Sequence, residues 1–205
     1  MKILAEHVEK KFRQEWVVRS FSFEFESGQS YALTGPNGSG KSTLLRILAQ
    51  YSLPTKGKVN FLQDNLSSFE AEQCHSLVAY AAPYVELIEE FTLSELISFL
   101  IQLKALPAQI SLDLFQQYIE LQPDKNKFIK NYSSGMRQKI KLGITLLANK
   151  PFLFFDEPTT NLDEKAKKWF YQKIKEQSNR LIIIASNEAA EINLCQHRIS
   201  ILDFK

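Results

Sequence analysis

The segment that decides the fold reads GPNGSGKS and occupies residues 35–42. It matches the pattern G-x-x-x-x-G-K-[ST] and follows the apolar run YAL at residues 31–33. Residues 44–48 then place leucine and isoleucine side chains on one helical face, in a helix that we expect to end near Pro54. Glycines let the backbone amides of such a loop point at phosphate oxygens, and the helix start adds its positive dipole end. Strand, glycine-rich loop and helix in this order predict a phosphate-binding P-loop.

Two side chains at the end of this loop carry its chemistry. We expect the ammonium of Lys41 to reach the β- and γ-phosphates of a nucleotide, and the hydroxyl of Ser42 to take one octahedral position on Mg²⁺. The alternative is an ordinary glycine turn that caps a helix, which gives a chance match in a chain of this length on the order of once in a hundred. The loop by itself does not choose among kinases, GTPases and transport ATPases, because all of them share it.

A second motif is an acidic pair at the end of a hydrophobic run. Residues 152–155 read FLFF, which is typical of a strand buried on both faces, and Asp156 and Glu157 follow at the end where α/β sheets place their ligands. Asp156 suits the Mg²⁺ shell, while Glu157 is placed to polarise the water that attacks the γ-phosphate. The alternative is a solvated strand end before a turn at Pro158, and the P-loop earlier in the chain makes the functional interpretation the better one.

The remaining patterns alternate between the two secondary structures. Residues 16–26 alternate apolar and polar side chains and predict a strand, while the segment 91–121 has helical spacing interrupted at Pro107. Toward the C-terminus the expected elements are a helix at 139–148, a strand at 151–156, a helix at 164–177 and a strand at 181–186. This order predicts an α/β protein with a parallel sheet, a β-rich opening and a small helical insert.

Composition limits the classes of function. The chain has 205 residues, of which 44% are hydrophobic and 23% charged, so it supports one domain with a packed core. A net charge of +2 gives no reason to expect a nucleic-acid partner. Cys74 and Cys195 lack the spacing of a metal site and are interpreted as small hydrophobic core residues. No stretch approaches the ~18 apolar residues of a membrane helix, so any membrane attachment is expected through a partner.

A third motif points to a family. Residues 132–139 read YSSGMRQK, and Gly135 lies 156 − 135 = 21 positions before Asp156, which leaves room for one helix and a turn. With GPNGSGKST before it and FLFFDEPTTNLD after it, the chain resembles the nucleotide-binding subunit of ABC transporters over essentially its whole length. The resemblance implies one domain over residues 1–205: a P-loop NTPase core with an N-terminal antiparallel β subdomain and an α-helical insert at approximately 84–138 that carries this signature motif.

The resemblance also implies ATP contacts. The signature residues Ser133, Ser134 and Gly135 would bind the γ-phosphate of an ATP held by the opposite subunit, and Asp163 would help to arrange that facing site. The alternative is that Ser133 or Ser134 is a plain helix cap, and Asp163 could cap the helix from Glu164 as well as arrange the facing site. Phe12 would stack on adenine, although Phe12 or Trp16 could also serve as an ordinary core or edge aromatic. The P-loop residues expected to contact ATP are Gly35, Pro36, Asn37, Gly38, Ser39, Gly40, Lys41, Ser42 and Thr43.

The sequence departs from the family at two positions. The glutamine of the Q-loop is expected within residues 80–84, at Pro83, and no glutamine is present there. The switch histidine is expected after Ser186, where the chain has Asn187. An asparagine can donate a hydrogen bond to a γ-phosphate oxygen but cannot carry a positive charge. We therefore expect Asn187, with Glu157 and Lys41, to support a slower hydrolysis.

These motifs together predict a Mg-dependent ATPase that uses ATP and Mg²⁺. It would energise a multisubunit ABC membrane transporter, paired with a second cassette as a homo- or heterodimer, on the cytoplasmic face of the cell membrane through integral membrane subunits. The alternative is a weakly hydrolysing cassette that holds ATP beside a competent partner. A soluble family member acting on DNA or the ribosome is disfavoured, because the chain shows neither a long coiled coil nor a second cassette. Substrate and direction of transport stay open.

Overall fold

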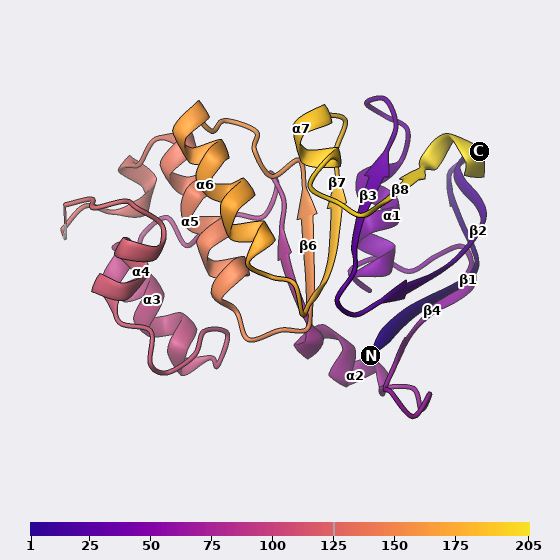
Figure 1. Ribbon diagram of the computed structural model, residues 1–205, viewed down its shortest axis with the longest axis horizontal. Coiled ribbons are helices and arrows are strands. Elements are labelled where there is room, and N and C mark those ends of the chain that lie inside the picture. The colour runs from indigo at the N-terminus through magenta and orange to yellow at the C-terminus, as the bar shows by residue number, and fades with distance from the viewer. Residues whose placement is uncertain (125) are drawn as a thin grey trace. The chain divides into compact units, whose positions relative to one another are not determined.

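The computed structural model describes residues 1–124 and 126–205 and divides them into two compact units. The first unit comprises residues 1–80, 150–157 and 177–205, and the second comprises residues 81–149 and 158–176. Figure 1 shows the strands of the first unit and the helices of the second. The predicted α/β class, with an antiparallel and a parallel sheet, is confirmed.

Two sheets make up the first unit. The antiparallel sheet has the order β2-β1-β4, with β1 at Lys2–Phe12, β2 at Glu15–Glu26 and β4 at Lys56–Leu62. The second sheet has the order β5-β6-β7-β3-β8, and its pairs β6–β7, β7–β3 and β3–β8 are parallel. Its strands are β3 Ser30–Thr34, β5 Val78–Ala81, β6 Phe152–Asp156, β7 Leu181–Ala185 and β8 His197–Ser200. The helices of this unit are α1 Lys41–Leu48, α2 Ala71–Cys74 and α7 Ala189–Ile192, with 3-10 turns at His75–Leu77 and Ile201–Phe204.

The central strands are buried on both faces. All five residues of β3, of β6 and of β7 are buried, which explains why their sequences are continuous apolar runs without alternation. Phe152 and Phe154 of β6 join Ile183 of β7 in the same hydrophobic core as α1. Full burial of each such side chain contributes about 1.5–3 kcal/mol. This rigid sheet fixes the strand ends from which the acidic pair projects.

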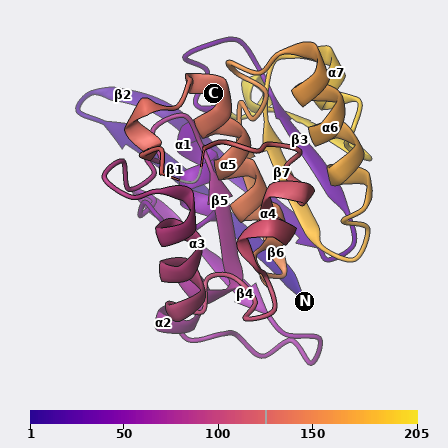
Figure 2. The same cartoon turned by 90° about the vertical axis from the view of Figure 1, so that its left-hand side faces the viewer.

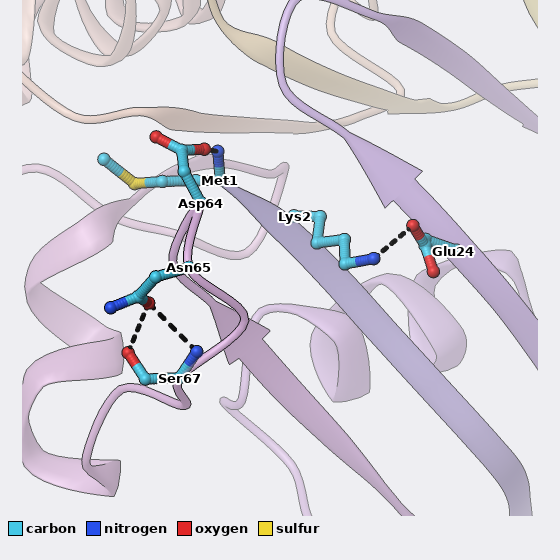
Figure 3. A network of polar contacts seen from close by, with 6 residues as sticks. All are labelled: Met1, Lys2, Glu24, Asp64, Asn65 and Ser67. Atoms are coloured by element: carbon cyan, nitrogen blue, oxygen red, sulfur yellow. Dashed lines mark hydrogen bonds and ion pairs between the residues drawn. The ribbon is translucent and has the colours of Figure 1, made fainter.

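One side of the antiparallel sheet faces solvent and carries exposed ion pairs. Lys2 on β1 donates from its ammonium to a carboxylate oxygen of Glu24 on β2 at 2.6 Å (Figure 3). Next to it the N-terminal ammonium of Met1 contacts the carboxylate of Asp64, in the loop that follows β4. Within that loop the side-chain oxygen of Asn65 accepts from the amide and hydroxyl of Ser67. The two exposed ion pairs are each worth under about 1 kcal/mol.

Helices make up the second unit, and each of the four described here starts at a hydroxyl or carboxylate cap. They are α3 Leu93–Gln102, α4 Leu112–Tyr118, α5 Ser134–Leu147 and α6 Glu164–Lys175, with a 3-10 turn at Ile129–Asn131. The hydroxyl of Thr92 caps α3 by accepting from the Glu95 amide. The Thr92 amide in turn donates to a carboxylate oxygen of Glu95 at 2.7 Å, which completes a capping box. Figure 2 shows α3 and α4, which pack together.

Two helix boundaries differ from those expected. Helix α1 ends at Leu48 rather than near Pro54, because Gln50 adopts a left-handed φ of 60° and the Tyr51 amide bonds back to the Arg46 carbonyl at 2.8 Å. Helix α5 begins at residue 134 rather than 139, because the hydroxyl of Ser133 accepts from the Met136 amide and caps it there. In both cases the chain ends or starts a helix by local hydrogen bonds that hydrophobic spacing does not reveal.

Gly57 on β4 allows a test of how tightly the antiparallel sheet is packed. Its φ is 78°, and a Cβ atom there would lie 2.2 Å from the carbonyl oxygen of His7 on β1. We expect Gly57→Ala to destabilise the fold by about 3 kcal/mol, from left-handed strain plus a backbone clash. Gly38→Ala is the matched control, because Gly38 has nearly the same φ, 77°, with nothing within 4 Å. Denaturant unfolding of both variants should show the larger loss in Gly57→Ala, and equal losses would contradict the packing.

Candidate functional site

The P-loop backbone depends on three glycines in conformations that other residues rarely adopt. The φ angles are 150° at Gly35, 77° at Gly38 and 103° at Gly40. Gly40 also needs its missing side chain, since a Cβ there would lie 2.6 Å from Cγ1 of Val17. The amide of Ser39 bonds to the Pro36 carbonyl at 3.1 Å and closes the turn. The loop therefore has a curled backbone, directly before the first residue of α1, as a phosphate-binding loop requires.

Lys41 lies inside this loop. Only 4% of the residue is exposed, and its ammonium donates to the carbonyl oxygens of Gly35 at 2.8 Å and Pro36 at 3.2 Å. Both of these partners are neutral carbonyl oxygens, so the hydrogen bonds to the ammonium bring it no compensating negative charge. A buried ammonium of this kind is stabilised by an anion, which is the property that a phosphate site requires. The buried hydroxyl of Ser39, another residue expected to contact ATP, has no hydrogen-bond partner among the residues that the structure describes.

The metal-binding prediction concerns Ser42 and Asp156. Ser42, in the first turn of α1, donates from its hydroxyl to a carboxylate oxygen of Asp156 at 2.9 Å. Asp156 is 1% exposed, at the last position of β6. A hydroxyl and a carboxylate in contact beside a phosphate loop fit Mg²⁺, which takes oxygen ligands, few of them from protein and the rest from water and substrate phosphate. The donor set therefore suits the ion.

Glu157 follows immediately and has a strained backbone. Its φ is 44°, in the left-handed region, and its amide donates to the Ala185 carbonyl of β7 at 2.9 Å. A non-glycine residue in this region costs on the order of 1–3 kcal/mol and persists where the surroundings enforce it. The side chain is half-buried. The regular extended backbone of β6 therefore ends at Asp156, directly before Glu157.

Asn187 stands at the end of the neighbouring strand β7. The buried Ser186 before it donates its amide to the Leu33 carbonyl at 3.1 Å, and its hydroxyl accepts from the Glu188 amide at 2.9 Å. The exposed side chain of Asn187 donates from Nδ2 to Oδ1 of Asn37 in the P-loop at 3.0 Å. The first unit thus brings together the P-loop, Ser42, Asp156 and this asparagine.

Phe12 ends β1 and is 49% exposed, with the ammonium of Lys10 5.0 Å from the ring centroid. An open ring beside a cation is suited to stacking on a nucleobase. Trp16, the other aromatic considered, is half-buried and has Lys11 and Lys56 at 5.4 and 5.3 Å from its ring centroid. Of these two rings, Phe12 is the more accessible.

The signature and D-loop residues lie in the second unit. Ser133, Ser134, Gly135 and Asp163 line a cavity of about 440 Å³. Ser133 caps α5, and Oδ1 of Asp163 caps α6 by accepting from the Ala166 amide at 2.8 Å. The alternative of helix capping therefore holds for both residues and does not exclude an anion contact.

Two lysines to which the motifs assigned no role lie on helix α5 itself. Lys139 is 7% exposed and lines this cavity, and burial lowers the pKa of its ammonium. Lys141 donates to the carbonyl oxygens of Ala82 at 3.1 Å and of Pro83, at the Q-loop position, at 3.5 Å. Burial, together with the positive charge of Arg137, lowers the pKa of the Lys141 ammonium. A lysine thus bonds to the backbone at the position where the resemblance led us to expect a glutamine.

The two cysteines are free thiols. Cys74 is buried, as expected of a core residue, whereas Cys195 is only half-buried, because it follows the short helix α7 at the surface. Burial raises the pKa of the Cys195 thiol to about 12, so it stays protonated and unreactive near neutral pH.

Most of this chain matches one protein-family model. Residues 18–160 match the family model described as ABC transporter, which covers well over half of the 205 residues. The chain belongs to the ABC transporter family. This ABC-family chain therefore has the P-loop and the acidic strand within the matched region, while Asn187 lies beyond it.

Curated relatives of this ABC-family chain include larger proteins. One is ABC transporter A family member 7 of Dictyostelium discoideum, 26% identical over 208 residues that cover 98% of this chain and 25% of the relative. Another is Nod factor export ATP-binding protein I of Burkholderia lata, 26% identical over 202 residues that cover 96% of this chain and 66% of the relative. The chain thus spans a quarter to about two thirds of the length of these relatives.

Solved structures confirm the fold of an ABC ATP-binding cassette. A dimeric ATP-binding cassette in a post-hydrolysis state, bound to ADP and Pi, superposes with a TM-score of 0.82 at 20% identity, covering 97% of this chain and 93% of that one. A bacterial Atm1-family ABC exporter with ATP bound gives a TM-score of 0.78 at 20% identity, covering 97% and 36%. The predicted P-loop NTPase fold is therefore confirmed. Among the helices of the described residues, none has the length and apolar character that a membrane span needs.

Proposed function

We propose that this chain binds Mg·ATP and hydrolyses it, as the ATPase subunit that energises a multisubunit ABC membrane transporter. The observation that supports this proposal most strongly is the 2.9 Å contact between Ser42 and Asp156, beside a P-loop that stores the Lys41 ammonium. One cassette domain over residues 1–205, with a helical subdomain at approximately 84–138, belongs to the same proposal. Transport and ATP binding are properties of the family, and hydrolysis rests on these residues.

The proposed mechanism assigns one task to each side chain. Lys41 leaves its carbonyl partners to bind the β- and γ-phosphates, and the P-loop amides bind the remaining phosphate oxygens. Ser42 and Asp156 would hold Mg²⁺, which would supply positive charge against the phosphate groups. Glu157 orients the attacking water and accepts its proton. Asn187 donates to a γ-phosphate oxygen, and Phe12 stacks on adenine.

The proposal includes a second cassette, identical or homologous. Ser133, Ser134 and Gly135 at the start of α5 would bind the γ-phosphate of an ATP held by that partner, and Asp163 would arrange the facing site. Two observations support this step: these residues line an open cavity, and a structural neighbour is itself a dimeric cassette. The complex would attach to the cytoplasmic face of the cell membrane through integral membrane subunits, without nucleic acid.

The test is phosphate release from ATP by the purified chain, with Mg²⁺ and with the metal removed by EDTA. We expect release only with Mg²⁺, at a rate per chain that rises with protein concentration, because two chains complete each site. Binding of ATP without release, at every concentration, would contradict hydrolysis by this chain and would favour the cassette that holds ATP for a competent partner.

A pH profile tests the substitution at the switch position. The amide of Asn187 does not titrate, and the three histidines lie elsewhere: His7 on β1, His75 stacked on Tyr51, and His197 on β8. We expect hydrolysis by the wild type to change less than about twofold between pH 6.5 and 8. Asn187→His should introduce a titration in that range, because the unperturbed imidazole pKa is about 6.5. A steep wild-type profile that Asn187→His leaves unaltered would contradict the role of Asn187.

A further inference from the structure

Two asparagines from distant parts of the chain meet at the P-loop. Nδ2 of Asn187 donates to Oδ1 of Asn37 at 3.0 Å, across 150 positions of sequence. Both side chains are exposed, so a ligand can reach them. Neither backbone is loose: Ser186 anchors the turn after β7 through its amide and hydroxyl, and the bond from the Ser39 amide to the Pro36 carbonyl closes the loop around Asn37.

The number of N–H groups decides what this pair offers. Each asparagine amide has two N–H donors and one carbonyl acceptor, so the pair has four N–H groups. The bond between Asn187 and Asn37 uses one, and 4 − 1 = 3 remain, whichever of the two amides donates. The three remaining N–H donors carry no net charge and suit the terminal oxygens of a phosphate.

We propose that Asn37 and Asn187 form an amide clamp for the γ-phosphate of ATP, in which Asn37 is the positioning residue that holds Asn187 in the orientation for binding. This inference deepens the proposed function and rests on it. An exposed asparagine alone rotates freely, and ordering it on the phosphate costs part of the bond that it forms. The bond to Asn37 orders the Asn187 amide before the nucleotide arrives, which lowers that cost.

A double-mutant cycle on nucleotide discrimination tests the clamp. The affinities of ADP and of the non-hydrolysable analogue AMP-PNP, both with Mg²⁺, are measured for wild type, Asn37→Ala, Asn187→Ala and the double variant. ADP lacks the γ-phosphate, so the ratio of the two affinities reports the clamp and cancels general damage to the P-loop. We expect the preference for AMP-PNP to fall about tenfold in each single variant and no further in the double variant, because two residues that act as one unit are not additive.

Asn193→Ala is the matched control. This asparagine is also exposed, at the C-terminal end of α7, and its replacement should leave the ratio unchanged. Losses that multiply in the double variant, or an Asn37→Ala protein with the wild-type ratio, would overturn the clamp while leaving the proposed function intact. A wild type that binds neither nucleotide would overturn both, and binding of ADP to wild type therefore separates the two failures.

Discussion

Replacing Glu157 by glutamine will abolish ATP hydrolysis and leave Mg·ATP binding intact. Glutamine has the size and shape of glutamate but cannot accept a proton from the attacking water, and removing a general base typically costs 10²- to 10⁴-fold in rate. The backbone of Glu157 supports a functional role. Its φ of 44° is a strained conformation, and its amide donates to the Ala185 carbonyl, which holds it in place. We therefore expect a fall of at least about a hundredfold in phosphate release per chain.

The matched control for this change is Glu72→Gln, which makes the same chemical change at an exposed position on α2. Its hydrolysis rate should equal that of the wild type. ATP affinity is measured on both variants, so that a folding defect is separated from a catalytic one. A Glu157→Gln protein that binds ATP and turns it over at the wild-type rate would show that another group activates the water.

Replacing Lys41 by alanine will remove most of the stabilisation that Mg·ATP gives to the wild type. At about 100 times its dissociation constant a ligand adds about 2.7 kcal/mol, which corresponds to a rise of roughly 5–10 °C in Tm for a domain of this size. The variant lacks the Lys41 ammonium, which in the free protein bonds to two P-loop carbonyls. No positive side chain of the P-loop then remains to bind the phosphates of the nucleotide.

Thermal unfolding with and without Mg·ATP measures this effect as the difference between two Tm values. The comparison is needed because Lys41→Ala also removes two hydrogen bonds of the free protein and so shifts its own baseline. Lys168→Ala, at an exposed position on α6, is the control and should keep the full ligand-induced rise. An equal rise in Lys41→Ala and wild type would place the nucleotide elsewhere.

Local patterns in the sequence predicted much of this architecture. The apolar runs at 152–155 and 181–184 predicted buried parallel strands, because only a strand covered on both faces tolerates such continuous hydrophobicity. The glycines of the P-loop predicted a curled backbone, and their positive φ angles confirm it. These features depend on neighbouring residues, and spacing alone reveals them.

Other features depend on partners that are distant in sequence or on the balance of local hydrogen bonds. The left-handed Gln50 that ends α1 has no glycine to signal it. The contact between Asn37 and Asn187, and that between Lys141 and the Pro83 carbonyl, join positions 150 and 58 residues apart. No charge pattern or periodicity in the sequence links the members of either pair, so these contacts become visible only in the folded chain. Both involve positions at or beside the two departures from the family.

The location of a bound metal shows whether Ser42 and Asp156 form the Mg²⁺ site of an ATPase. Mn²⁺ replaces Mg²⁺ in oxygen sites and scatters anomalously, so a crystal grown with Mn²⁺ and AMP-PNP shows where the ion lies. We expect one strong anomalous peak in contact with the Ser42 hydroxyl and next to the Asp156 carboxylate, with the triphosphate in the P-loop and Lys41 on its β- and γ-phosphates. A nucleotide bound in the P-loop with the metal held by other residues, or no nucleotide in the P-loop at all, would contradict the proposed site.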